Sequence, residues 1–401
     1  MAIINFVVPP LSKTKFSGGI LCILRYANGL CERGHTVNVI PLAPCDKPEW
    51  INNKYTFITK SRDSLLGVIK NYSVYLSSKL ISRISANKRI RDIVNNSDLT
   101  GGLMWIQQDL SQGVRKALAC DVLTNSLPDA DFTVATSFET AMPVYFHGKG
   151  VLFYFMQHFE PYFCQEYSEP DQAEKEALLS YKLGLNMIAN STWLKNKVEK
   201  HSRQGKVDLC LNAIDNNLFY GEPRVRTHAD KVINIISYGG RNARWKGFED
   251  MAYAIRELKT TLKEYTIRWQ VYGDALLPPD NGIASYESLG FLTQEELAQA
   301  YRNAHILLSF SWYESFPLFP LEAMSSGLPV ITTEYGVEDY AFHGETAEIA
   351  KSRDVRSLVD SLIRVVIDYE YANNIAAAGN KYSKNFNWSK SIHNMERILL
   401  G

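Results

Sequence analysis

The chain has 401 residues, enough for two domains of ordinary size, and its 46% hydrophobic and 21% charged residues are typical of a globular protein with a sizeable core. Its 43 basic and 43 acidic residues cancel, which argues against a nucleic-acid-binding protein, because such proteins usually carry a basic excess. There is no signal peptide pattern, no stretch of transmembrane length, and no C-x-x-C pair among the six cysteines. We therefore expect a cytoplasmic protein with reduced thiols and no zinc site.

The first part of the chain predicts a β-α-β unit. Residues 3–8 form an apolar strand, a helix is expected from Gly18 and Gly19 to about residue 32, and residues 36–42 form the next strand. The glycine pair opens the helix, so backbone N–H groups there can approach a phosphate or a sugar closely. A tight turn explains the two glycines equally well, since the pattern is not G-x-G-x-x-G.

Residues 61–94 combine Leu, Ile and Tyr with interspersed Lys and Arg, among them Lys88, Arg89 and Arg91. A basic amphipathic helix of this kind can lie on an anionic membrane surface. The same stripe is also typical of the core-facing side of an ordinary domain helix. Both interpretations stay open at this point.

Polar residues flank the next two predicted strands, at 132–136 and 151–156. Asp129 and Asp131 precede the first of them and form a D-x-D pattern, which can bridge a divalent ion to a diphosphate. His158 follows the second strand, at its carboxyl end, where a cleft is expected. Its imidazole can exchange hydrogen bonds with a sugar hydroxyl, or it can be satisfied within the loop.

A polar segment at 216–230 predicts a domain boundary, after which the αβ pattern restarts. The strand at 232–237 is followed by two glycines and then by Arg241 and Lys246, with Arg244 as a further cation between them. Two cations at the carboxyl end of a strand suit a diphosphate leaving group, because they stabilise the negative charge that grows on it as the bond breaks. Arg supplies a bidentate fork and Lys a point charge. A solvated basic turn is the alternative.

The stretch from residue 305 to 333 has an apolar strand at each end and two acids, Glu314 and Glu322, between them. Pro317 and Pro320 fit the first turn of a helix and Gly327 fits its end. The acids are eight residues apart, and because a helix repeats every ~3.6 residues, the helix is expected to lean both toward one cleft. Carboxylates accept hydrogen bonds from hydroxyls and helix N-termini hold phosphates, so the pattern suits a nucleotide sugar.

The segment ESFPLFPLEAMSSGLP, which starts at Glu314, resembles the E-x7-E motif of retaining GT-B glycosyltransferases of family 4. The resemblance implies an α/β protein with two Rossmann-like domains facing across a cleft. Residues 1–217 would bind the acceptor and residues 218–383 the nucleotide-sugar donor. Residues 384–401 would form a closing helix that crosses back to the N-terminal domain.

The resemblance also implies roles for individual residues. Glu322 resembles the acid that binds the ribose, Glu314 the acid that touches the transferred sugar, and His158 the histidine near the reacting sugar. The remaining residues match the family's contacts to the donor or its diphosphate: Gly18, Gly19, Arg241, Lys246, Ser315 and Phe316. Pro317 departs from the pattern, because it stands where a glycine is usual and has no N–H to offer.

The function implied is retaining transfer of a hexose or deoxyhexose from a nucleoside-diphosphate sugar to a saccharide or lipid-linked saccharide, in surface polysaccharide or lipopolysaccharide synthesis. No metal and no other cofactor is expected. The protein is expected to act in the cytoplasm or at the inner face of the membrane. Residues 154–167 resemble rhamnosyltransferases of bacterial surface polysaccharides, which points to a deoxysugar donor. Two alternatives remain. A metal-dependent GT-A transferase would use Asp129 and Asp131 in a single-sheet domain, and a non-catalytic subunit would only bind saccharide.

Overall fold

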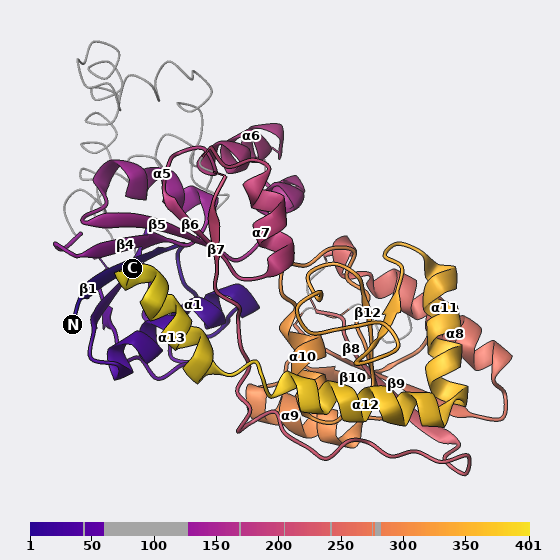
Figure 1. The fold of residues 1–401 in the computed structure, drawn as a ribbon. Helices are drawn as coiled ribbons and strands as arrows, with labels where there is room; N and C mark the ends of the chain where they lie inside the picture. The colour runs from indigo at the N-terminus through magenta and orange to yellow at the C-terminus, as the bar shows by residue number, and fades with distance from the viewer. Residues whose placement is uncertain are drawn as a thin grey trace. The chain divides into compact units, whose positions relative to one another are not determined.

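The computed structural model describes residues 1–42, 45–59, 127–167, 170–203, 205–240, 243–274, 276 and 282–401. They fall into two compact units, each built on one parallel sheet (Figure 1). Unit 1 lies within residues 1–190, 194–211 and 389–401, and unit 2 within residues 191–193 and 212–388. The basic segment 61–94, with Lys88, Arg89 and Arg91, lies outside the described residues.

The sheet of unit 1 has seven parallel strands in the order β3-β2-β1-β4-β5-β6-β7. Its strands are β1 (Ile3–Val8), β2 (Thr36–Pro41), β3 (Thr56–Phe57), β4 (Phe132–Ala135), β5 (Val151–Met156), β6 (Asn186–Ala189) and β7 (Val207–Leu209). The chain runs outward in one direction from β1 and in the other from β4, and these two strands pair at the centre. The loops after such neighbours part to opposite sides, so a ligand crevice is expected at their carboxyl ends.

The described helices of unit 1 are α1 (Gly18–Glu32), α5 (Phe138–His147), η2 (Glu160–Glu166), α6 (Pro170–Ser180), α7 (Thr192–Glu199) and α13 (Trp388–Leu400). α1 has the predicted bounds, and Ser17 caps it by accepting a hydrogen bond from the N–H of Ile20. α6 begins at Pro170. Proline is favoured in a first helical turn because its missing N–H has no partner there.

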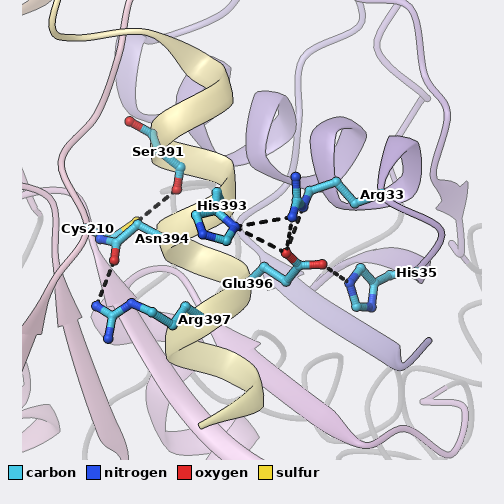
Figure 2. A network of polar contacts seen from close by, with 8 residues as sticks. All are labelled: Arg33, His35, Cys210, Ser391, His393, Asn394, Glu396 and Arg397. Carbon is cyan, nitrogen blue, oxygen red and sulfur yellow. Dashed lines mark hydrogen bonds and ion pairs between the residues drawn. The ribbon is translucent and has the colours of Figure 1, made fainter.

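The last helix, α13, packs on unit 1 beside α1, as expected for the closing helix (Figure 2). Glu396 of α13 accepts hydrogen bonds from Nε of Arg33 at 2.7 Å and pairs with Nε2 of His35 at 2.9 Å. A Cβ atom on Gly29 of α1 would lie 2.1 Å from Cδ1 of Ile392. The glycine therefore allows the two helices to approach closely at this point.

The sheet of unit 2 has six parallel strands in the order β10-β9-β8-β11-β12-β13. They are β8 (Val232–Tyr238), β9 (Thr266–Tyr272), β10 (Glu287–Gly290), β11 (Ile306–Leu308), β12 (Val330–Thr333) and β13 (Glu348–Ala350). The described helices are η3 (Arg244–Lys246), α8 (Phe248–Thr261), α9 (Gln294–Asn303), α10 (Leu318–Ser325), α11 (Val355–Ile367) and α12 (Tyr369–Ser383). Here β8 and β11 are the central neighbours from which the chain runs outward.

Two sheets in two units contradict the GT-A alternative, which predicted a single-sheet domain. Asp131 lies just before β4, and its carboxylate accepts a hydrogen bond from the N–H of Ile3 at 2.8 Å. It therefore fixes the start of two strands, at the edge of the sheet opposite to the carboxyl ends. Among the described residues, no cluster of His, Cys, Asp and Glu is able to hold a metal ion. Within the same residues, no helix is both long and apolar enough to cross a membrane.

Candidate functional site

Two of the predicted features meet at the carboxyl edge of the unit 1 sheet. A Cβ atom on Gly19 would lie 3.3 Å from Cβ of Gln157 and 3.8 Å from Nε2 of His158. The start of α1 after β1 therefore touches the turn after β5, and a larger residue at position 19 would press on that turn. His158 is half-buried, and its ring centre lies 4.9 Å from that of Phe163 in η2.

Two acids in this part of unit 1 were assigned no role from the sequence. Glu139 of α5 is buried and bonded to the hydroxyl of Tyr167, and Glu160 at the start of η2 is bonded to the hydroxyl of Tyr154. Burial raises the pKa of both carboxyl groups, and the charge of Glu139 raises that of Glu160 further. Glu160 and Pro161 follow an apolar strand in the sequence, which is a signal for a site. Because α5 was not predicted, the contacts of Glu160 with that helix could not be predicted either.

In unit 2 the cationic turn follows β8 and depends on glycine. Gly247, between η3 and α8, has φ of 69°, and a Cβ atom there would lie 2.1 Å from the carbonyl oxygen of Phe310. Only glycine fits this backbone conformation and this close contact, so position 247, directly after Lys246, requires a glycine. Arg244 is exposed, with its guanidinium 5.5 Å from the ring centre of Trp312. Arg241 lies outside the described residues.

Lys246 forms an ion pair with Glu314, 68 residues further along the chain. The two side chains are only 16% and 8% exposed, so the pair is largely shielded from water. The ammonium group also lies 4.2 Å from the ring centre of Trp245. The cation predicted for the diphosphate and the acid predicted for the transferred sugar are therefore direct neighbours.

The loop after Glu314 is held by Gly336, whose φ is 77°. A Cβ atom on Gly336 would lie 2.5 Å from the carbonyl oxygen of Glu314. Ser315 is buried, and its Oγ has no partner among the described residues. The Phe316 side chain packs on the rings of Tyr340 and Phe386, which leaves its backbone for any contact with a ligand.

The helix of the E-x7-E segment starts later than predicted. α10 begins at Leu318, Pro317 is its N-cap in an extended conformation, and Pro320 is its third residue. Glu314 therefore lies in the loop, so its eight-residue distance from Glu322 is not two helical turns. The cause is local, because the extended backbone of Pro317 at the N-cap delays the helical conformation to Leu318.

Glu322 is 4% exposed, and its Oε2 has no partner in the part of the chain that the structure describes. Burial raises its pKa to about 8. Burial, then Glu314, and to a smaller extent Glu322 raise the pKa of the Tyr340 hydroxyl, so both acids act on one neighbourhood. A buried polar atom without a partner costs free energy, so this oxygen is well suited to accept a ligand hydroxyl.

Part of the chain is similar to known glycosyltransferases. Residues 233–368 match the family model described as "Glycosyl transferases group 1", and this range contains Lys246, Glu314 and Glu322. The chain is 28% identical over 229 residues to the O-antigen biosynthesis protein RfbC of Myxococcus xanthus, a match that covers 56% of this chain and 17% of that protein. It is 25% identical over 177 residues to a D-inositol 3-phosphate glycosyltransferase of Corynebacterium diphtheriae, covering 41% and 42%.

The chain thus spans less than half the length of either curated relative. Among solved structures, HepE of Anabaena in complex with UDP-glucose matches with a TM-score of 0.66 and 14% identity, over 100% of this chain and 99% of that one. A likeness at this low identity shows the fold alone. The predicted GT-B fold, with two α/β units built on parallel sheets, is confirmed.

Proposed function

We propose that this chain, a GT-B protein whose residues 233–368 match the group 1 glycosyltransferases, is a retaining glycosyltransferase of family 4. It transfers a hexose or deoxyhexose from a nucleoside-diphosphate sugar to a saccharide or lipid-linked saccharide. The observation that carries the proposal is the shielded Lys246–Glu314 pair in the same unit as the open, buried carboxyl group of Glu322. This set offers one group for each part of a nucleotide sugar.

On the donor side, Glu322 accepts a hydrogen bond from a ribose hydroxyl and Lys246 meets the diphosphate, with Arg241 as its second cation. Ser315 lies beside Glu314, and its Oγ and backbone contact the donor. When the bond between the anomeric carbon and the phosphate oxygen breaks, the electron pair stays on the phosphate, and the charge of Lys246 stabilises it. Because side-chain cations take this role, the reaction is expected to need no metal ion.

The acceptor hydroxyl attacks the anomeric carbon from the face that the diphosphate leaves, and its proton passes to the departing phosphate oxygen. No protein nucleophile takes part, and the configuration is retained. We assign acceptor binding to unit 1, where His158 beside Gly19 exchanges a hydrogen bond with a sugar hydroxyl. Pro317 offers no N–H to the donor sugar, so the sugar contacts differ from those of the usual glycine-containing loop.

Surface polysaccharide or lipopolysaccharide synthesis is proposed as the setting. The name of the Myxococcus relative, an O-antigen biosynthesis protein, supports it, as does the rhamnosyltransferase-like segment 154–167. A lipid-linked acceptor would bring the protein to the inner face of the membrane. Vesicle binding that weakens when Lys88, Arg89 and Arg91 are all replaced by Gln would support such a contact, and indifference to anionic vesicles would exclude it.

A thermal-shift panel of nucleoside diphosphates and nucleotide sugars tests the donor assignment, because a ligand that binds the native state raises the melting temperature. We expect one base to stabilise the protein, and transfer with the matching sugar to proceed in EDTA with the anomeric configuration retained, as followed by NMR. An inverted product would overturn the retaining mechanism. Loss of transfer in EDTA would show that the reaction needs a metal ion. Saccharide binding without donor binding would identify a non-catalytic subunit.

A further inference from the structure

The carboxyl group of Glu160 joins two turns at the carboxyl edge of the unit 1 sheet. Its Oε1 accepts a hydrogen bond at 2.9 Å from the N–H of Phe138, the first residue of α5, and its Oε2 is bonded to the hydroxyl of Tyr154 on β5. The N–H of Glu160 donates to the hydroxyl of Tyr181 at 3.2 Å. The turn that carries His158 is therefore tied to the helix after β4 and to the core beneath it.

The tether is rigid, because its anchors are buried. Tyr154 and Tyr181 are fully buried, and their rings stack with centres 6.1 Å apart. Phe159, between His158 and Glu160, is also buried and stacks on Tyr181 at 5.9 Å. On its other side the turn meets Gly19, as described above. His158 is thus held between a glycine that leaves room for it and an acid that fixes the backbone two residues later.

No cation pairs with Glu160 among the described residues, and the groups that face it are acids or weak acids. They are Tyr154 on β5, Glu139 on α5, Cys164 in η2, Tyr167 after it, and Tyr181 after α6, with Glu174 and Glu176 of α6 acting on Cys164. An ionised carboxylate in such surroundings is costly, whereas a neutral one can both donate and accept a hydrogen bond. Burial and Glu139 accordingly raise the pKa of Glu160.

We propose that Glu160 is a positioning residue for His158: its carboxyl group locks the turn after β5 and so aims the imidazole at the acceptor hydroxyl. The inference rests on the proposed function, in which His158 meets that hydroxyl. It assigns Glu160 no contact with either substrate. Its effect is expected in the acceptor step and not in donor binding.

Glu160→Gln and Glu160→Ala test the proposal together. The amide of Gln can accept from the Phe138 N–H and donate to the Tyr154 hydroxyl, so Glu160→Gln should keep kcat within about twofold at neutral pH. Glu160→Ala should lower kcat by about 10- to 100-fold, the loss that a misplacement near 1 Å can cause, with donor KM unchanged. Tyr154→Phe removes one hydrogen bond while keeping the packing and should fall between them.

The pH profile separates positioning from mere stability. Burial and then Glu139 raise the pKa of Glu160, so in the wild type a rise in pH through that pKa should ionise Glu160, weaken the tether and lower kcat, whereas in Glu160→Gln this fall should be absent. Wild-type kcat in both Glu160→Ala and Tyr154→Phe, with only a lower melting temperature, would overturn the inference. If Glu160→Ala does not fold, the same fall in kcat with rising pH in Glu160→Gln as in the wild type would also overturn the inference. Full activity of His158→Ala would instead overturn the role of His158 itself.

Discussion

The two units handle buried acids at their carboxyl edges in opposite ways. In unit 2, Glu314 is paired with a cation, Lys246, and Glu322 keeps an open oxygen. In unit 1, Glu139 and Glu160 are bonded to tyrosine hydroxyls and a backbone N–H, and no cation pairs with either in the part of the chain described. Units built on similar parallel sheets can therefore provide a charged site or a neutral one, according to the partners of their acids.

This difference matches the proposed ligands. A diphosphate is an anion, and it needs a cation that is already desolvated and fixed, as Lys246 is by Glu314 and the ring of Trp245. An acceptor hydroxyl is neutral until it reacts, and a strong field near it is not required. If so, removal of a charge in unit 2 should slow the transfer reaction, whereas removal of a charge in unit 1 should change only the stability of the protein.

The largest effect is expected from removing the charge in unit 2. Lys246→Ala should lower kcat by about 10²-fold or more, as the loss of one oxyanion-hole donor does. The reason is that the ammonium group stabilises the negative charge that develops on the phosphate as the bond breaks. Lys263→Ala, at an exposed position of the same unit, is the control and should turn over as the wild type does. Normal turnover of Lys246→Ala at saturating donor would refute the leaving-group role.

The second prediction concerns the backbone that carries Glu314. Gly336→Ala places a Cβ atom 2.5 Å from the carbonyl oxygen of Glu314 and should displace the 314–316 loop. We expect kcat/KM for the donor to fall by more than tenfold, as a displacement near 1 Å can cause. Gly344→Ala is a matched control, since its φ of 75° imposes the same backbone strain but its Cβ meets nothing within 4 Å. Equal activity of the two variants would show that only strain matters.

The third prediction is a change in KM. Glu322→Ala removes a contact with the ribose that is made about equally in the ground state and the transition state, so donor KM should rise while kcat changes little. We expect a rise of about tenfold, the effect of losing one hydrogen bond and leaving the ribose hydroxyl without a partner. A fall in kcat with KM unchanged would move Glu322 from binding to chemistry. Melting temperatures of both forms should be measured first, since the buried site loses volume.

Several of these features were predictable because they depend on neighbours in sequence. Apolar runs gave β1 and β5 their predicted bounds. Gly247 directly after Lys246 signalled a turn that only glycine fits. Short strands such as β10 and β13 were missed, because three or four residues of mixed polarity carry no periodicity.

The pairing of the site residues was not predictable in the same way. Lys246 and Glu314 lie on loops after β8 and β11, which the sheet order brings together across 68 residues. Spacing along the chain even misled at Glu314, which precedes α10 and is not on it. The pKa of Glu160 is raised by its burial and then by Glu139, which lies in a helix that the sequence did not reveal. Charge state is a property of the folded surroundings, so residue type alone does not predict it.

The smallest effect is expected at Glu396 of unit 1, an acid that does have a cation but lies on α13, away from the carboxyl-edge loops (Figure 2). Hydrogen bonds from Arg33 and then His35 lower its pKa to about 2. Because the folded pKa lies below the unfolded one, its stabilisation is present above about pH 4.5 and is lost as the pH falls through about 2. Glu396→Gln should therefore melt a few degrees below the wild type at pH 7, with the difference shrinking in acid.

The activity of Glu396→Gln tests whether charge in unit 1 affects the reaction as well as stability. At a temperature well below melting, Glu396→Gln should keep wild-type kcat and donor KM, because the contacts of Glu396 join α13 to Arg33 and His35, between α1 and β2. Glu174→Gln, at an exposed position of α6, serves as the control and should change neither property. If Glu396→Gln lost activity without losing stability, charge in unit 1 would reach the reaction, and the contrast between a charged donor unit and a neutral acceptor unit would fail.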